Sequence, residues 1–513
     1  MGFPITQKKP LILIVWIAIL GLLLSAYAAR GGLHLISRNY NISAEANGMN
    51  GVLRVADGKR LYAPQSERPY SIYLYPPLHG WVMGKALRLL GVQSLAARVL
   101  LVRICSLLFL VAAFAILWRF FAKPANIEPG YFALAVLLVL PKFADYTTST
   151  RNDTLSLLWE ISSFALFSHW WQSRKENYLF LFLFTCLASV CTRQTGVVAF
   201  GTAVLWLLLH REWGTAVWLA GIYSALVASF IYAANEITGG AFLDQAFYAN
   251  LRYLPPQFQF FSLSLITFLL SYVIFTLAFL AFYRRQNFRS RLDSTNLVTL
   301  GIFCSGAMAL MLFFRAGGDV NYFFETLLLA VPLAALGIRE LASRKSFQVA
   351  CALQMLLIAG VLFLKTKSAA QTAFYPYAEA AARLRLEYEP FGIVDGSLAP
   401  ALNLHLRGWA YHGPDVTNGG NLGRYSHERT RWVMGDTAIA FRTHQIHTIV
   451  VAQPDCAEHL DRAPALPISR KRWNSFSDAE AWYPWLCVYR RPHDPTGKPV
   501  EISRLQPADA ATH

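Results

Sequence analysis

A short polar break in a long apolar run, FFRAGGDVNYFFE at residues 313–325, is the first feature that could carry chemistry. It contains the acids Asp319 and Glu325 together with Arg315 and Asn321, and the sequence on both sides is apolar. A charge at membrane depth costs roughly 2.5–3.5 kcal/mol on insertion scales, so charged residues in such surroundings are usually functional. The break is therefore predicted to be a turn between two helices, part of a polar site, or both.

Two other polar breaks place an arginine beside an amide or an acid. They are YTTSTRND, which contains Arg151 and Asp153, and CTRQT, which contains Arg193 and Gln194. The planar guanidinium fork binds phosphate through paired, charge-assisted hydrogen bonds, and a carboxylate can deprotonate an incoming hydroxyl. The residues predicted to bind an anionic, amphipathic substrate are Arg151, Asp153, Arg193, Gln194, Arg315, Asp319, Asn321 and Glu325.

Each of these residues also has a purely structural interpretation. Asn152 or Asp153 could be the N-cap of the following helix, and Asp319 or Asn321 could cap the helix that carries Glu325. An arginine near a membrane surface, such as the one in CTRQT, can instead extend its charged group to the lipid headgroups. Taken one by one, the polar residues do not decide between these interpretations.

Composition identifies the elements that must position these side chains. Of the 513 residues, 55% are hydrophobic and only 15% are charged, and the mean hydropathy is +0.36. Soluble domains carry about 25% charged residues, so the chain is predicted to be an α-helical, polytopic membrane protein. About eleven apolar segments are nearly long enough to cross a membrane: 10–29, 99–120, 130–144, 153–171, 177–192, 195–210, 214–233, 261–282, 297–314, 321–338 and 348–364.

The net charge of +16 is distributed in a way that indicates membrane topology and not nucleic-acid binding. Lysine and arginine gather in every second loop, which is the positive-inside pattern, and this predicts a cytoplasmic N-terminus. The pair 177–192 and 195–210 is interpreted as a hairpin, because one long helix would place the RRQNFRSR loop outside. With this topology, the polar breaks above and the segment 30–98 lie on the outer face, where they would converge on one cavity. The odd number of spans also places the C-terminal tail on the outer side.

The chain changes character after Lys365. Helical patterns at 374–389 and 431–444 alternate with strand patterns at 391–397, 446–453 and 485–492, which predicts a small extramembrane α/β domain over 366–492. Residues 493–513 are predicted to be a disordered tail. Cys456 and Cys487 fall in this outer region, where they could form a disulfide or remain two separate thiols.

The order of these features resembles the GT-C superfamily of integral-membrane glycosyltransferases. The branch concerned contains protein O-mannosyltransferases, the aminoarabinose transferase of lipid A and RgtA/B/C/D-like bacterial enzymes. The resemblance covers residues 10–365 by order and topology. It rests on an acid after the first span (Glu45), a Gly-x-x-x-Tyr element (Gly58 to Tyr62), a Tyr-Pro-Pro-Leu element (Tyr75 to Leu78), Arg151-Asn152-Asp153, Arg193-Gln194, and Asn321 to Glu325.

The resemblance implies a GT-C-like bundle over 1–365 and transfer of a sugar from a polyprenyl-phosphate donor to an acceptor hydroxyl, with inversion in a single displacement. The acceptor would be a glycan, a lipid or a protein, at the outer face of a bacterial cytoplasmic membrane. The family usually has an aspartate as base in the first outer loop; here Glu45 is the first candidate and Asp57 the second, although Asp57 with its following glycine also has the pattern of a turn. Tyr75 and His79 are further predicted substrate-binding residues.

Cofactor and competing functions stay open at this point. Some GT-C members use a divalent metal beside the catalytic acid and others do not, and His34 and His79 lack a second histidine at ligand spacing. One competing function is transport of a lipid-linked sugar, although transporters usually have inverted repeats, which this sequence lacks. The other is an inactive scaffold, which the missing aspartate would explain.

Overall fold

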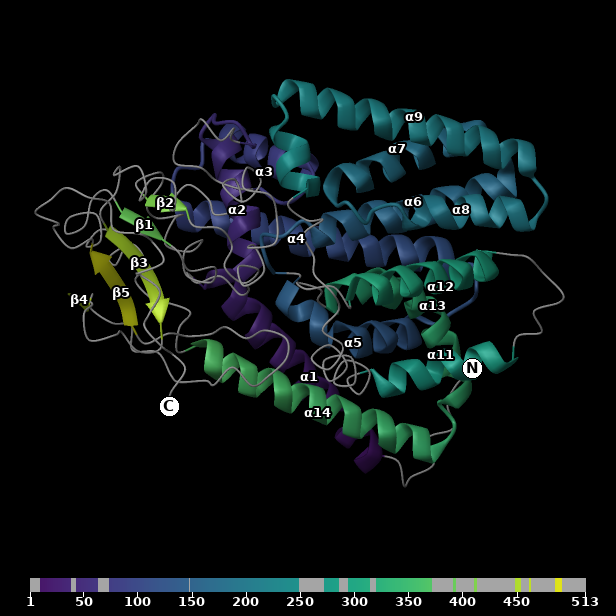
Figure 1. The fold of residues 1–513 in the computed structure, drawn as a ribbon. Helices are drawn as coiled ribbons and strands as arrows, with labels where there is room; N and C mark the ends of the chain where they lie inside the picture. Colours follow the sequence, from purple (N-terminus) through teal and green to yellow (C-terminus); the bar gives the residue numbers. More distant parts are fainter. Residues whose placement is uncertain are drawn as a thin grey trace, which may run out of the picture.

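The computed structural model describes residues 10–37, 43–62, 73–146, 148–248, 272–285, 294–313 and 320–370, and five short strands beyond them. Figure 1 shows a bundle of helices of which several run nearly side by side. The helices are α1 (Pro10–Ile36), α2 (Ser43–Ala56), α3 (Pro77–Leu89), α4 (Leu95–Leu117), η1 (Trp118–Ala122), α5 (Pro129–Tyr146), α6 (Asp153–Ser173), α7 (Glu176–Thr192), α8 (Val198–Leu209), α9 (Trp213–Ile237), η2 (Leu243–Tyr248), α11 (Val273–Arg285), α12 (Ser294–Phe313), η4 (Val320–Phe323), α13 (Phe324–Leu341) and α14 (Lys345–Ala370).

Each apolar segment predicted from the sequence coincides with a helix, with the segment 261–282 described only from residue 272 onward. The predicted hairpin at 177–210 is confirmed, because α7 ends at Thr192 and α8 begins at Val198. Among the described residues, six helical stretches are long and apolar enough to cross a membrane: Ile14–Ile36, Leu95–Ala122, Trp213–Ile237, Asn296–Phe313, Val320–Leu341 and Lys345–Lys367. The chain is thus a multi-pass membrane protein, and the total of eleven spans stays a prediction.

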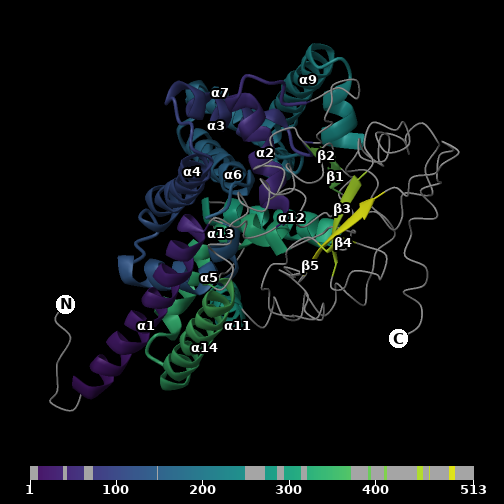
Figure 2. The same ribbon diagram turned by 90° about the vertical axis from the view of Figure 1, so that its left-hand side faces the viewer.

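The centre of the bundle is built by α6 and α13. Helix α6 packs against α4, α7 and α8, and α13 packs against α5, α11 and α12. The contact between α11 and α13 is close enough that a Cβ at Gly337 would collide with the backbone carbonyl of Ala278. Figure 2 shows that α1 and α14, from opposite ends of the helical region, lie side by side, and their packing closes one flank of the bundle.

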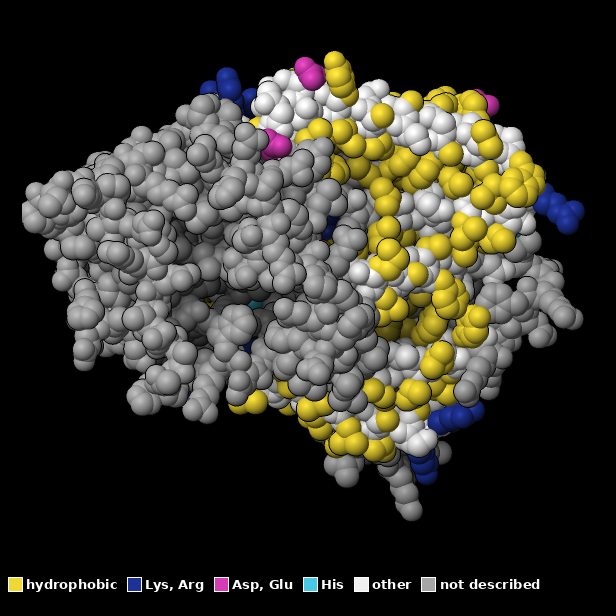
Figure 3. All heavy atoms as spheres, in the orientation of Figure 1, with side chains coloured by type: hydrophobic (Ala, Val, Ile, Leu, Met, Phe, Trp, Pro, Cys, Tyr) yellow, Lys and Arg dark blue, Asp and Glu magenta, His cyan; other side chains and the backbone are white. Residues whose placement is uncertain are grey.

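The outer surfaces of several helices are apolar. Ile17 of α1, Val217 of α9 and Leu364 of α14 are 61%, 70% and 71% exposed. In Figure 3 hydrophobic side chains spread over much of the visible described surface. Such a surface suits lipid contact, since apolar patches of this extent are rare on soluble monomers.

Two short helices precede the second long one. Helix α3 begins at Pro77, directly after Pro76, and the sequence PPLHGWVMGKALRLLG at 76–91 has the pattern of an amphipathic, interfacial helix with a proline at its start. Helix α2, which carries Glu45, was not predicted from the sequence. Helices α2 and α3 pack against each other and form a layer beside the bundle.

The described strands beyond α14 are β1 (Phe391–Ile393), β2 (Ala410–His412), β3 (Thr448–Gln453), β4 (Asp461–Arg462) and β5 (Trp485–Arg490). They form one sheet in the order β2-β1-β3-β5-β4, parallel between β2, β1 and β3 and antiparallel between β3, β5 and β4. Three of them lie in segments where strands were predicted. The helices predicted at 374–389 and 431–444, the tail 493–513 and Cys456 lie outside the described residues, so the domain boundaries stay a prediction.

Candidate functional site

The carboxylate of Asp153, the first residue of α6, is the centre of a buried polar cluster. Its Oδ2 lies 2.6 Å from Nε of Arg151, and its Oδ1 lies 3.3 Å from Nη1 of Arg193. The same Oδ1 accepts a hydrogen bond of 2.8 Å from Nδ2 of Asn321. The polar breaks before α6, after α7 and before α13 therefore meet at one carboxylate.

Both arginines of this cluster are also held by an aromatic ring. The guanidinium carbon of Arg151 lies 5.0 Å from the ring centroid of Tyr146, and that of Arg193 lies 4.9 Å from the ring centroid of Tyr322. The two arginine side chains are only 10% and 12% exposed. Two cations fixed in surroundings with little water attract an anion more strongly than the same cations on a wet surface.

Gln194 fixes the segment that carries Tyr75. Its Nε2 donates hydrogen bonds to the backbone oxygens of Leu74, at 2.7 Å, and Ala246, at 2.6 Å. The hydroxyl of Tyr62 donates to the backbone oxygen of Tyr75 at 2.6 Å. Burial raises the pKa of Tyr75, with the charge of Arg151 opposing the shift, so the phenol keeps its proton. Gln194 thus holds the backbone at Leu74 and Ala246 in position.

His79, on α3, is buried beside the cluster. It is 1% exposed, and neither ring nitrogen has a hydrogen-bond partner within the described part of the chain. Burial lowers the pKa of His79 to about 4, against an opposing effect of the Asp153 charge. The imidazole is therefore neutral at physiological pH and presents a donor and an acceptor to a ligand.

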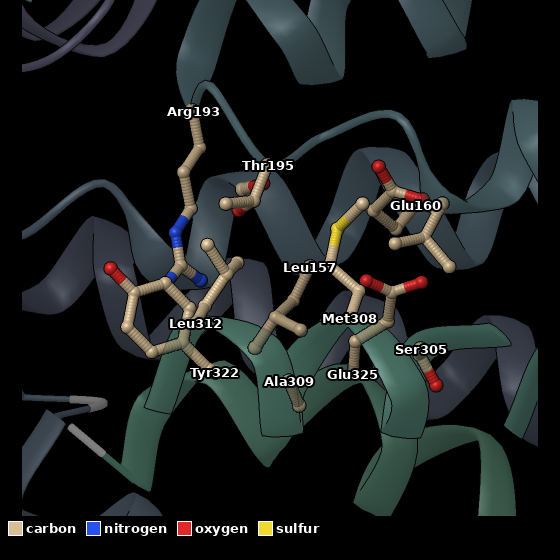
Figure 4. A pocket seen from close by; sticks show the side chains of 12 residues that line it. Leu157, Glu160, Arg193, Thr195, Ser305, Met308, Ala309, Leu312, Tyr322 and Glu325 are labelled. Carbon is tan, nitrogen blue, oxygen red and sulfur yellow. The ribbon is translucent and has the colours of Figure 1, made fainter. Parts of the chain in front are cut away.

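A small pocket continues from the arginine cluster into the bundle. Figure 4 shows Arg193 above the ring of Tyr322, and the carboxyl groups of Glu160 and Glu325 close to each other on the other side of the pocket. Glu160 accepts hydrogen bonds from Oγ of Ser189 at 2.8 Å and from the backbone N–H of Ala199 at 2.9 Å. The space that a water-sized sphere can occupy is about 20 Å³, which is room for about one water molecule.

Glu45 forms an ion pair with Arg103 of α4. The distances are 2.8 Å from Nε to Oε1 and 3.3 Å from Nη2 to Oε2, and both side chains are fully buried. The backbone N–H of Thr150 donates to Oε1 of Glu45 at 3.0 Å, and the Thr150 hydroxyl donates to its backbone oxygen at 2.9 Å. Glu45 therefore fixes the turn that leads to Arg151.

Asp57 is also paired, with Arg98 at 2.6 Å, and its side chain is 28% exposed. This pair joins the end of α2 to the start of α4. Each of the two predicted bases is thus engaged in an ion pair with an arginine of α4. Arg315 and Asp319 lie outside the described residues.

The contacts of Asn152, Asn321 and Arg193 differ from the capping and headgroup roles that the sequence allows. Asn152 occupies the N-cap position of α6, but its side chain donates to the backbone oxygen of Thr192 at 2.6 Å and caps nothing. Asn321 bonds to Asp153 and not to its own helix. Arg193 contacts an acid and an aromatic ring, and its side chain is largely buried.

Two buried residues of this region, Arg103 and Glu160, were not predicted. Each stands alone in an apolar segment, in LLVRICSLL and LSLLWEISS, where a charge is costly. That isolation is a usable signal, because an unpaired charge would not be tolerated there. Their partners come from other helices, which a single sequence does not reveal.

A metal site does not fit the described acids. In the ranges described above, no group of three or more His, Cys, Asp and Glu side chains could hold a metal ion. Asp153 and Glu45 each face arginines, which compete with a cation. A metal ion therefore has no part in the steps proposed below.

Similarity to solved structures covers nearly the whole chain. ArnT from Cupriavidus metallidurans, solved with undecaprenyl phosphate bound, superimposes with a TM-score of 0.57 at 11% identity, covering 94% of this chain and 98% of that one. The chain has the GT-C fold. The same enzyme in the apo state gives a TM-score of 0.56 at 13% identity, with the same coverage. The resemblance to the GT-C superfamily inferred from the sequence is thus confirmed at the level of the fold.

A sequence family adds to this agreement over part of the chain. Residues 75–235 match the family described as dolichyl-phosphate-mannose-protein mannosyltransferase. This GT-C region begins at Tyr75 and includes Arg151, Asp153 and Arg193, so the match contains most of the arginine cluster. No curated protein sequence matches the chain as a relative.

Proposed function

We propose that this GT-C protein transfers a sugar from a polyprenyl-phosphate donor to an acceptor hydroxyl at the outer face of a bacterial cytoplasmic membrane. The observation that carries the proposal is the convergence of Arg151 and Arg193 on the buried start of α6. An ArnT structure of the same fold holds undecaprenyl phosphate, which supports a lipid phosphate as the ligand. The N-terminus would be cytoplasmic and the C-terminal domain would lie outside, as the loop charges favour.

The donor phosphate would bind to the guanidinium groups of Arg151 and Arg193. Their forks can offer paired charge-assisted hydrogen bonds, and the start of α6 adds the positive end of a helix dipole. Asp153 and Asn321 would hold the arginines in position, and His79 and Tyr75 would contact the sugar or the acceptor. Arg315 and Asp319 belong to the same predicted site.

In the reaction, the acceptor oxygen would attack the anomeric carbon from the side opposite the phosphate. The bond between that carbon and the phosphate oxygen breaks, and the lipid phosphate leaves with one more negative charge. The arginines would stabilise this charge as it develops. The acceptor proton passes to a base, for which Glu45 and then Asp57 are the candidates.

For Glu45 to act as the base, its pairing with Arg103 would have to loosen. The Arg103 guanidinium occupies both carboxylate oxygens of Glu45 and the backbone N–H of Thr150 also donates to Oε1, so an acceptor hydroxyl would have to displace one of these donors. Asp57 is less buried, but it too is paired.

The test is transfer by purified protein in nanodiscs supplied with radiolabelled polyprenyl-phosphate sugars and membrane acceptors. The expected result is release of free polyprenyl phosphate together with a labelled acceptor, both lost in Arg193→Ala and kept in Arg174→Ala. Arg174 is a matched control because it forms an exposed ion pair with Glu212, and both residues lie in loops beyond α6 and α8. Translocation of the lipid without transfer would identify a flippase, and neither activity with any donor would favour a scaffold.

A further inference from the structure

The pair formed by Glu160 of α6 and Glu325 of α13 has no part in the transfer described so far. Their carboxyl groups lie close to each other across the pocket (Figure 4), and two neighbouring carboxylates in a buried site cannot both ionise, so the pair holds a proton. Glu160 accepts hydrogen bonds on both oxygens from Ser189 and Ala199, which favours its charged form. The shared proton therefore belongs mainly to Glu325, and the pair carries one negative charge.

Arg193 is the cation that this pair faces. It lines the same water-sized pocket and interacts electrostatically with both glutamates. Arg193 thus interacts with two negative groups: it forms an ion pair with Asp153, and it lines the same pocket as the acid pair (Figure 4). The other titratable groups that face the pair are Cys186 of α7, Cys304 of α12 and Tyr223 of α9.

Glu325 retains an unused hydrogen-bonding atom at this point. Its Oε1 is buried and has no partner among the residues that the structure describes. A buried carboxyl oxygen without a partner is costly, and it is stabilised when it gains a proton or a water. A second proton must go to Glu160, the remaining carboxylate of the pair, and the protonated Glu160 can then donate a hydrogen bond to this Oε1 of Glu325.

We propose that Glu160 and Glu325 are positioning residues for Arg193 and take up a second proton when a phosphate monoester binds to Arg193. The inference rests on the proposed function, because it assumes that the arginine cluster binds phosphate. The charged pair attracts Arg193 and so competes with the ligand for it. Protonation of the pair removes this competition, and by linkage phosphate binding and proton uptake then favour each other.

The charges balance over the transfer reaction. The phosphate of the donor is a diester with one negative charge, and the departing lipid phosphate gains a second when its bond to the sugar breaks. The acceptor hydroxyl releases one proton in the same step. If the pair takes up one proton, it loses the charge that the phosphate gains, and the total negative charge around Arg193 stays constant.

The decisive variant is the double substitution Glu160→Gln, Glu325→Gln, which resembles the fully protonated pair in shape and charge. Calorimetry of undecaprenyl phosphate binding to the full-length protein in nanodiscs would be run over a range of pH and in buffers of different ionisation enthalpy. We expect the wild type to take up more protons than the double variant, since titration of the ligand itself is common to both. Where one full proton is linked, the affinity of the wild type should rise up to roughly tenfold per unit fall in pH.

At alkaline pH the double variant should bind undecaprenyl phosphate more tightly than the wild type, and the difference should vanish as the pH falls. Misfolding would weaken binding, so it cannot produce this result. Glu212→Gln, in the exposed pair with Arg174, should behave as the wild type. Glu325→Asp, which keeps two carboxyl groups, should retain the pH dependence in part.

Two results would overturn the inference while the proposed function stands: equal proton uptake by the wild type and the double variant, or weaker binding by the double variant at every pH. Failure of the wild type to bind undecaprenyl phosphate at any pH would overturn the proposed function itself. The two failures are therefore distinguishable in one set of titrations.

Discussion

Glu45 and Arg103 form a two-point ion pair between α2 and α4, with both side chains removed from solvent. Arg103 also donates hydrogen bonds of 2.7 Å to the backbone oxygens of His34 and Ser37. One guanidinium thus joins the end of α1, the start of α2 and the middle of α4. This arrangement gives Glu45 a structural role whether or not it also acts as a base.

Arg103→Ala should destabilise the protein by about 3–5 kcal/mol, because it leaves the Glu45 carboxylate buried without its partner. The double variant Arg103→Met, Glu45→Met should recover much of this loss, since it removes both charges and keeps apolar volume. Thermal unfolding in one detergent measures both effects. Arg174→Ala is the control, since the exposed pair with Glu212 contributes little. Equal unfolding temperatures for wild type and Arg103→Ala would contradict the structural role.

Glu45→Gln separates the structural from the catalytic role of this residue. If Glu45 is the base, transfer should fall by at least the roughly 10²-fold that general base catalysis contributes, at a temperature where the variant is still folded. Glu45→Asp should then restore part of the rate, because it returns a carboxylate. If folded Glu45→Gln transfers the sugar at the wild-type rate, Glu45 is not the base. Asp57→Asn should then lose activity.

Arg193→Ala should weaken undecaprenyl phosphate binding by about 1.5–3 kcal/mol, the usual contribution of hydrogen bonds to a charged group. Arg193→Lys should recover only part of the loss, because an ammonium keeps the charge but lacks the planar fork. Binding can be measured by calorimetry in nanodiscs. Unchanged affinity in Arg193→Ala would remove this residue from the phosphate site.

Gln194→Ala should loosen the layer that carries Tyr75. It leaves the backbone oxygens of Leu74 and Ala246 without their amide donor, at a cost of about 1–3 kcal/mol for each buried acceptor that water does not reach. Proteolysis should therefore become faster near residues 73–76, and the KM for the donor should rise more than kcat falls. Gln348→Ala is a control, because the side-chain amide of Gln348 also donates to a backbone oxygen, that of Ala342, in a different part of the chain. Equal proteolysis of the two variants would contradict the assigned role of Gln194.

The helical segments could be predicted from the sequence because their signal is local. An apolar run such as that of α9 by itself predicts a helix in the membrane, and the arginine-rich loops predict which end of each helix is cytoplasmic. Tertiary partners are not local: Asp153 and Asn321 are 168 positions apart, and Glu45 and Arg103 are 58 positions apart. The sequence therefore indicates that Arg151, Arg193 and Asn321 belong to one face, but not that they share one carboxylate.

The side-chain partner of Glu45, the first candidate for the base, could not be predicted from the sequence. The sequence shows an acid at a suitable position in the first outer segment, and it does not show that α2 turns this acid toward Arg103. Glu160 was not predicted because it lies seven residues inside α6, in an apolar segment and not in one of the polar breaks. Its partner Glu325 was predicted, and only the packing of α6 against α13 brings the two together.

The buried imidazole of His79 should make stability depend on pH. Its pKa is about 4 in the folded protein and about 6.5 when the chain is unfolded, so the unfolded state binds more protons between these values. The contribution of neutral His79 is thus fully present above pH 6.5 and is lost as the pH falls toward 4, by about 2 kcal/mol at pH 5. His79→Phe should remove this slope with little cost at neutral pH, because neither ring nitrogen has a partner among the described residues. The measurement is the unfolding temperature of the wild type and of His79→Phe at several pH values, because the difference between them cancels the contribution of all other groups. Parallel curves of unfolding temperature against pH would show that His79 is not buried in its neutral form.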